Sequence, residues 1–148
     1  MKITNYNLLE MNAALAKFED KKLPQKITFA IMKNLAIFAK EQKFYQDALN
    51  KILSKYSEYY EKDEDGNVQT EGNGLPVIQE EHVAAFYEEI NELLVVENEI
   101  ALHFIDKDAF EYDDPSNRYD VLTAKETFML MSLICPPEED EENKEEAE

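Results

Sequence analysis

The stretch QKITFAIMKNLAIFAKEQKFYQDALNKILSKYSEYYEK, residues 25–62, decides the fold, because it contains neither glycine nor proline. Apolar or aromatic side chains recur along it in alternating steps of four and three residues, with Gln42 as the one polar interruption. They are Ile31, Leu35, Phe38, Tyr45, Leu49, Ile52, Tyr56 and Tyr59. This spacing predicts one long helix over residues 24–62 with a coiled-coil-like seam, about 58 Å in length. Such a helix needs a partner along its apolar stripe to be stable.

The partner predicted for this seam is a second helix that follows a tight reversal of the chain. Residues 63–76, DEDGNVQTEGNGLP, hold all three glycines, and the pairs Asp65-Gly66 and Asn73-Gly74 are typical turn signals. Residues 79–98 show an apolar face at helical spacing and carry six acids, but neither lysine nor arginine. The long helix has seven lysines against four acids. Opposite charge therefore favours antiparallel pairing of the two helices.

Shorter elements are expected on both sides of this hairpin. Residues 2–6 and 99–105 have the patterns of short strands, which we expect to pair with each other. Capping boxes at Asn7 and Thr123 predict the starts of a first and a last helix. The predicted fold class is therefore mainly α, a long antiparallel helical hairpin with flanking short helices and a small β element (minor α+β). Because the second hairpin helix is short, residues 27–38 must pack against those flanking helices or against another subunit or protein.

Composition bounds the organisation of the chain. The 148 residues and their 44% hydrophobic content predict one domain, residues 1–135. Residues 136–148, PPEEDEENKEEAE, are predicted to be a disordered acidic tail. No apolar run has the length of a signal peptide or a membrane span, so we expect a soluble, intracellular protein that does not bind a membrane. The net charge of −18 and the single arginine, Arg118, argue against direct binding of nucleic acid.

The sequence shows no arrangement of residues that indicates catalysis. His82 and His103 are the only histidines, and neither belongs to the Glu-x-x-His motif of carboxylate-bridged metal sites. Cys135, the only cysteine, has no evident histidine partner, and there is no phosphate-binding loop, nucleophile elbow or zinc spacing. The Asp-x-Asp-Gly-Asn stretch from residue 63 lacks the ligands of a calcium loop. We therefore expect no enzyme activity, no metal and no cofactor.

The residues that the sequence offers for protein interaction lie on the hairpin. Tyr59 ends the seam, and Tyr60 lies beside it near the tip, where an exposed aromatic side chain is a typical interface anchor. Packing of these aromatic residues within the seam is the alternative. Leu35 and Phe38 belong to the half of the seam that the shorter helix does not reach. The acidic helix adds three carboxylates: Glu88, Glu89 and Glu92.

Three stretches resemble a family of uncharacterised small phage proteins from Gram-positive hosts. They are MKITNYNLLEMNAALAKFEDKKLPQKITFAIMKNL at residues 1–35, EEHVAAFYEEINELLVVENEI at 80–100 and LTAKETFMLMSLI at 122–134. The resemblance implies a phage-encoded accessory protein in the cytoplasm of the infected host cell, acting in virion or tail assembly or as a scaffold. It carries over no functional residues.

Two functions are therefore expected to compete. The first is an interaction protein that binds a phage structural protein or a host protein, or that associates with itself. The alternative is an acidic inhibitor of a host defence nuclease, which would imitate nucleic acid and occupy a basic groove. Binding by such a mimic weakens steeply between about 50 and 200 mM salt, whereas binding through an apolar interface is nearly indifferent.

Overall fold

The computed structural model describes residues 1–137, and the rest of the predicted acidic tail, residues 138–148, lies outside the described residues. The chain is mainly helical with a small two-stranded antiparallel sheet, which confirms the predicted fold class. Its elements are β1 (Lys2–Thr4), α1 (Asn5–Ala16), α2 (Gln25–Lys55), a 3-10 helix (Ser57–Tyr59), α3 (Glu80–Leu94), β2 (Glu97–Glu99), a second 3-10 helix (Lys107–Phe110) and α4 (Ala124–Ile134). No helix within residues 1–137 is long and apolar enough to cross a membrane.

The described residues form two compact units, and each unit is discontinuous in sequence. The first consists of Met1–Glu10 and Phe38–Ile100, and the second of Met11–Ile37 and the chain from Ala101 onwards. Helices α1 and α2 each run from one unit into the other. The prediction of a single domain over residues 1–135 stays a prediction.

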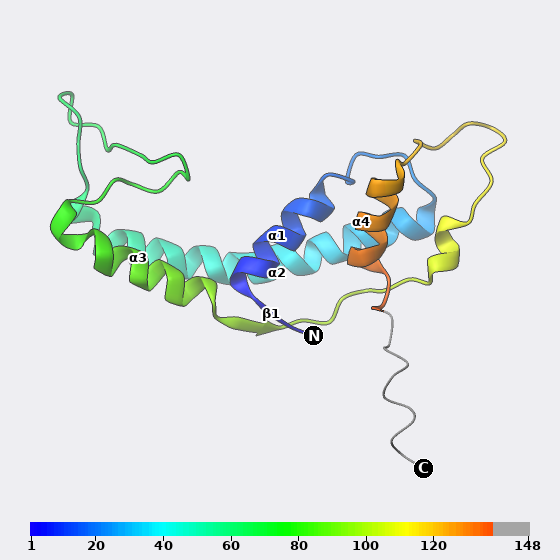
Figure 1. Cartoon of the computed structure of the whole chain (residues 1–148), viewed down its shortest axis with the longest axis horizontal. Coiled ribbons are helices and arrows are strands. Elements are labelled where there is room, and N and C mark those ends of the chain that lie inside the picture. The colour runs from blue at the N-terminus through cyan, green and yellow to red at the C-terminus, as the bar shows by residue number, and fades with distance from the viewer. Residues whose placement is uncertain (138–148) are drawn as a thin grey trace, which may run out of the picture. The chain divides into compact units, whose positions relative to one another are not determined.

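In the first unit, the C-terminal part of α2 and α3 form the predicted antiparallel pair (Figure 1). The order of contacts shows the direction: the Tyr59 ring stacks on the His82 ring at 3.6 Å between centroids, and Lys55 Nζ lies 2.5 Å from Glu89 Oε1. Between the helices lies a core of Leu49, Tyr56, Ile78, Phe86 and Ile90. These core side chains come from both helices and from the segment before α3, so burial of apolar surface holds the pair together.

Helix α2 ends at Lys55, seven residues before its predicted end at residue 62. The Tyr60 hydroxyl donates to the carbonyl oxygen of Leu53, and Ser57 Oγ donates to that of Ser54 at 2.9 Å. These bonds satisfy carbonyl groups that the last helical turn leaves without an intrahelical partner. The predicted seam residue Tyr59 therefore belongs to the short 3-10 helix Ser57–Tyr59 and not to a continuation of α2.

The hairpin tip is a closed arrangement of three backbone segments. The amide of Gln69 donates to Glu61 at 2.9 Å, that of Val77 to Gln69 at 2.8 Å, and that of Glu61 to Val77 at 2.8 Å, which closes a ring. The two turns between these segments place Gly66 and Gly74 at φ values of +82° and +79°. Isolated β-bridges pair Val68 with Lys62 and Thr70 with Pro76 within the tip.

Strands β1 and β2 form the expected pairing of chain segments, but in a shifted position. Ile3 faces Asn98 in the antiparallel register, and the two strands are three residues long each. The predicted strand at 99–105 is thus wrong beyond Glu99. A polar anchor next to the sheet helps to place the strand before residue 99. Buried Asn5 donates through Nδ2 to the Leu93 carbonyl at 2.8 Å, and its Oδ1 accepts from the Asn98 side chain at 2.8 Å. This anchor fixes the chain just upstream of residue 99.

The start of α1 differs from its prediction as well. The helix begins at Asn5, and Thr4 Oγ1 accepts a hydrogen bond from the Asn7 amide at 3.2 Å. A threonine whose hydroxyl accepts a hydrogen bond from the amide three residues later is a typical helix N-cap. The predicted capping residue, Asn7, is therefore wrong by three positions, because Asn5 is drawn into the anchor beside β2.

In the second unit, the half of the long helix that lacked a partner is covered by the chain itself. Ile27 and Ile31 are almost completely buried, as is Leu130 of α4. Helix α4 begins with the predicted capping box, since Thr123 Oγ1 accepts from the Glu126 amide at 3.1 Å and the Glu126 carboxylate accepts from the Thr123 amide at 2.8 Å. Residues 27–38 were expected to pack either against flanking helices or against another protein. For residues 27–37, which belong to this unit, the chain itself buries the apolar side chains Ile27 and Ile31.

Candidate functional site

The outer face of α3 carries a shallow groove of about 520 Å³, within the first unit. Its lining residues are Ala84, Tyr87, Glu88, Asn91, Glu92 and Val95. Steps of three and four residues place them on one side of the helix, opposite the buried Phe86 and Ile90. Eleven residue steps correspond to roughly 16 Å of helix. The groove is therefore about three turns long and lies largely on the side of α3 away from the core, although Tyr87 at its border also packs against the core.

The chemistry of this groove is apolar in part and acidic at its rim. Val95 is 66% exposed, and the neighbouring Val96 is also exposed. Glu88 and Glu92 are exposed and one turn apart. Helix α3 has five acids and neither lysine nor arginine. Glu80 and Glu81 lie in its first turn, where negative charge interacts favourably with the helix dipole. An exposed valine near two carboxylates suits a ligand that combines apolar and cationic groups.

The third predicted acid, Glu89, has a different position. It is half-buried between α3 and α2, where Oε1 meets Lys55 Nζ, and this contact lowers the pKa of the Glu89 carboxyl. Among residues 1–137, this is the ion pair that joins the two helices. Burial, followed by the charge of Glu89, raises the pKa of Tyr56. The predicted charge complementarity between α2 and α3 is thus represented by the Lys55–Glu89 pair, while Glu88 and Glu92 are exposed to solvent.

The aromatic residues predicted at the tip are partly buried. Tyr59 stacks on His82, and Tyr60 packs against the core of the unit while its hydroxyl is bonded to Leu53. The expectation that Tyr60 is an exposed anchor is therefore wrong, because its hydroxyl caps α2. Burial also raises the pKa of this hydroxyl.

The predicted seam residues Leu35 and Phe38 are also used by the chain. Phe38 is 0% exposed, and Leu35 is half-buried. A partner could reach Phe38 only after the surrounding structure had opened. The structure therefore brings together Glu88 and Glu92 as an accessible pair, and leaves the other predicted interaction residues within or beside the packed parts of the chain.

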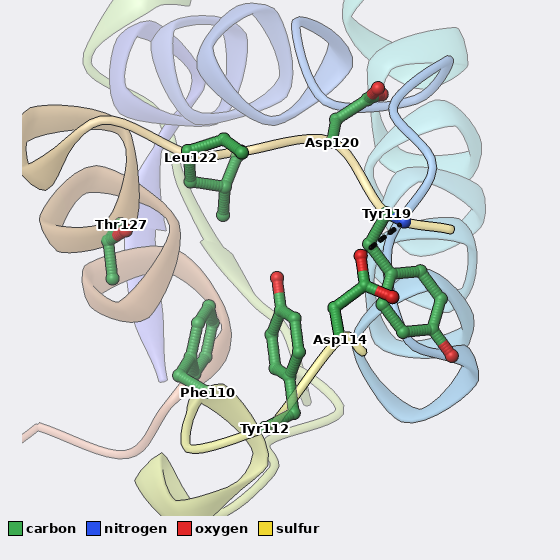
Figure 2. A pocket seen from close by; sticks show the side chains of 8 residues that line it. Phe110, Tyr112, Asp114, Tyr119, Asp120, Leu122 and Thr127 are labelled. Atoms are coloured by element: carbon green, nitrogen blue, oxygen red, sulfur yellow. Dashed lines mark hydrogen bonds between the residues drawn. The ribbon is translucent and has the colours of Figure 1, made fainter. Parts of the chain in front are cut away.

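A second concave site lies in the second unit, on the segment between the 3-10 helix Lys107–Phe110 and α4. The cavity measures about 290 Å³. It is lined by Phe110, Tyr112, Asp114, Tyr119, Asp120, Val121, Leu122 and Thr127. Figure 2 shows the rings of Phe110 and Tyr112 side by side, with the Tyr112 hydroxyl directed into the open space. No element was assigned to this segment from the sequence, although residues 110–120 hold three aromatic residues and three aspartates.

The turn that builds this cavity is held by Asp114. Its Oδ1 accepts from the Arg118 amide at 2.8 Å and its Oδ2 from the Tyr119 amide at 2.9 Å, as the dashed line in Figure 2 shows for Tyr119. Asn117, in the left-handed region at φ 49°, completes the reversal. These two backbone bonds hold the pKa of the Asp114 carboxyl below its ordinary value. The Asp114 side chain is therefore charged at neutral pH.

The residues noted for possible chemistry do not converge. In the part of the chain that the structure describes, no group of three or more His, Cys, Asp or Glu side chains is placed to hold a metal ion. Cys135 is buried at the end of α4, and burial raises the pKa of its thiol. The His103 ring meets the edge of Phe29 at 5.7 Å, and its backbone is bonded to Asn34. His82, as described above, packs on Tyr59.

Comparison of the chain with protein-family models, with curated proteins and with solved structures found no match in any of the three. The resemblance to a phage family therefore stays a prediction from the sequence. Function is accordingly inferred from the geometry of the two concave sites.

Proposed function

We propose that this chain is a non-enzymatic, phage-encoded accessory protein that works by binding another protein in the cytoplasm of the infected host cell, in virion or tail assembly or as a scaffold. The observation that supports the binding function is the outward groove of α3, with an exposed Val95 and the carboxylates of Glu88 and Glu92. The sequence resemblance supports the phage origin. The earlier candidate surface at Leu35 and Phe38 does not support it, because the chain covers these residues.

The groove favours a helical segment with lysine or arginine beside apolar side chains. An amphipathic helix that lies in an apolar groove is a common mode of peptide recognition, and its contacts repeat every three or four residues. The groove has this repeat and a length of roughly three turns. Complementary charge at the rim orients the partner and speeds association, while the apolar centre supplies affinity. Nucleic acid is disfavoured as a direct ligand, because α3 presents carboxylates to it.

The test uses charge reversal in the groove and a matched reversal elsewhere. The tagged protein, its Glu88→Lys/Glu92→Lys variant and a Glu58→Lys/Glu64→Lys control capture partners from infected and uninfected lysates at about 50 and 200 mM salt. Glu58 and Glu64 are exposed residues of the same unit, so the control changes net charge equally without touching the groove. We expect one protein to be captured by the wild type and the control at both salt concentrations, and at least tenfold less by the groove variant.

Reconstitution with the purified partner, measured by calorimetry, should give the same order of affinities. Equal capture by all three forms would refute the groove as the binding surface. Equal loss in both variants would show that overall charge, and not the groove, governs binding. Capture of a host nuclease that is lost at about 200 mM salt would favour the alternative, an inhibitor that imitates nucleic acid.

A further inference from the structure

The cavity of residues 110–127 is open to solvent on one side and is lined largely by aromatic and acidic residues. Phe110, Tyr112 and Tyr119 supply the rings and Asp114 supplies the negative charge, whereas the Asp120 carboxylate is turned away toward the Lys22 amide (Figure 2). None of its eight lining residues is basic. Aromatic faces carry a negative electrostatic potential and attract cations, and they do so best where water is excluded. The two kinds of wall therefore act in the same direction on a positively charged guest.

The walls of this cavity are fixed before any guest enters. Asp114 holds the turn through two backbone amides, as described above. Asp120 is held from both sides, since its amide donates to the Lys22 carbonyl at 2.8 Å and its Oδ2 accepts from the Lys22 amide at 2.8 Å. The rings of Tyr112 and Tyr119 meet edge to face, with 5.5 Å between centroids. Such preorganisation reduces the ordering cost of binding.

One ring of this cavity already lies near a cation of the chain. The guanidinium carbon of Arg118 lies 5.1 Å from the centre of the Tyr119 ring. Arg118 is exposed and does not line the cavity, so it occupies none of the cavity space. Burial, followed by the charge of Asp114, raises the pKa of the Tyr112 hydroxyl, which therefore stays neutral at physiological pH. Its hydroxyl adds a hydrogen-bond acceptor that points into the cavity (Figure 2).

We propose that this cavity binds a small organic cation, an alkylammonium group carried either by a lysine side chain of a partner or by a free amine. A volume of about 290 Å³ lies at the lower end of small-molecule sites, so it suits one cationic group and a short alkyl chain. The site lies in the second unit and the α3 groove in the first. The two sites are therefore independent, and failure of one proposal leaves the other standing.

The experiment compares a cation with an uncharged molecule of the same shape. Choline is titrated into the full-length ¹⁵N-labelled protein at constant ionic strength, in parallel with its carbon analogue, in which a tert-butyl group replaces the trimethylammonium group. We expect saturable shifts of the backbone amides of residues 110–127 with choline, and at least tenfold weaker binding of the analogue, because cation–π attraction and the charge of Asp114 both act on the cation alone. Equal binding of both molecules, or shifts without saturation, would overturn the proposal.

Variants of Tyr112 test the same point from the side of the protein. Tyr112→Phe keeps the ring and should bind choline within about threefold of the wild type, whereas Tyr112→Leu should weaken binding at least fivefold. Tyr6→Leu, at an exposed tyrosine of the other unit, is the control. Unchanged binding by the Tyr112→Leu variant would count against the site. If that variant fails to fold, the wild-type comparison of choline with its analogue decides alone.

Two further probes distinguish a lysine side chain of a partner from a free amine as the source of the cation. Butylammonium represents a free amine, and N-acetyl-lysine methylamide represents a lysine side chain in a polypeptide. Tighter binding of the lysine compound assigns the cavity to a partner protein, and tighter binding of butylammonium assigns it to a metabolite or polyamine. Binding of neither compound, in a protein that also fails to bind choline, refutes the site.

Discussion

Replacement of Asn34 by alanine should destabilise the protein more than any surface substitution. Asn34 is 0% exposed in α2, and its Nδ2 donates to the His103 carbonyl at 2.9 Å while its Oδ1 accepts from the His103 amide at 2.7 Å. The side chain thus pairs with both polar groups of one backbone residue, as a neighbouring strand would. Among residues 1–137, no β-strand or β-bridge pairs with the backbone of His103.

The size of the effect follows from these two bonds. Each contributes about 1 kcal/mol, and the His103 amide and carbonyl that lose their partner cost more where water is excluded. We therefore expect Asn34→Ala to lower the free energy of unfolding by about 3 kcal/mol, which is roughly 6–12 °C in Tm for a chain of this size. Gln46→Ala removes an exposed bond to Asn50 of 3.1 Å and should change stability by less than about 0.5 kcal/mol.

Urea denaturation followed by circular dichroism measures both variants, and hydrogen exchange at the His103 amide reports the bond directly. We expect that amide to lose its protection in the alanine variant, while amides of the first unit keep theirs. Asn34→Leu separates bonding from packing, because it restores volume without restoring the bonds. If Asn34→Leu is as stable as the wild type, the hydrogen bonds contribute little and the reasoning fails.

Two further predictions concern the tip and the start of α4. Gly74→Ala should destabilise the tip by about 1 kcal/mol because its φ is +79°, whereas Gly72→Ala should be nearly neutral; neither added Cβ would meet an atom within 4 Å, and urea unfolding compares the two. The pKa of the Glu126 carboxyl is lowered in the folded state, first by the Thr123 amide and then by Lys21. Its contribution to stability is therefore present above its ordinary pKa and is lost as the pH falls through the lowered value. Glu126→Gln should shift the urea midpoint at about pH 7 and much less at about pH 3, and equal shifts at both values would contradict this linkage.

The parts of the fold that the sequence predicted are those that depend on local pattern. The seam of α2, the capping box at Thr123 and the reversals at Gly66 and Gly74 are all set by residues within a few positions of one another. The element ends were less well predicted, because distant groups decide them. Tyr60 ends α2 by bonding to Leu53, and Asn5 starts α1 early because its side chain is held at Leu93.

The candidate sites were predicted to a smaller extent for the same reason. Glu88 and Glu92 stood out as charges on a helix and do line the α3 groove, but the contribution of Ala84 and Val95 requires the helix face to be known. The cavity at residues 110–127 depends on a turn that Asp114 closes over four and five residues. The hydrophobic periodicity of the sequence does not predict such a turn. The spacing of its aromatic residues gave a weak signal at most.

Hydrophobic periodicity measures how much of a helix must be covered, and it does not say what covers it. The sequence left open whether the stripe of α2 is covered by flanking helices or by another protein, and Ile27, Ile31 and Phe38 are all buried within one chain. A surface that is available to a partner should instead lie where apolar side chains stay exposed although the helix already has a buried face. Helix α3 meets this condition, because Phe86 and Ile90 are buried on one side while Val95 is exposed on the other. Glu88 and Glu92 lie on this exposed side, so the charged residues that make the surface soluble are also those that would select a basic partner.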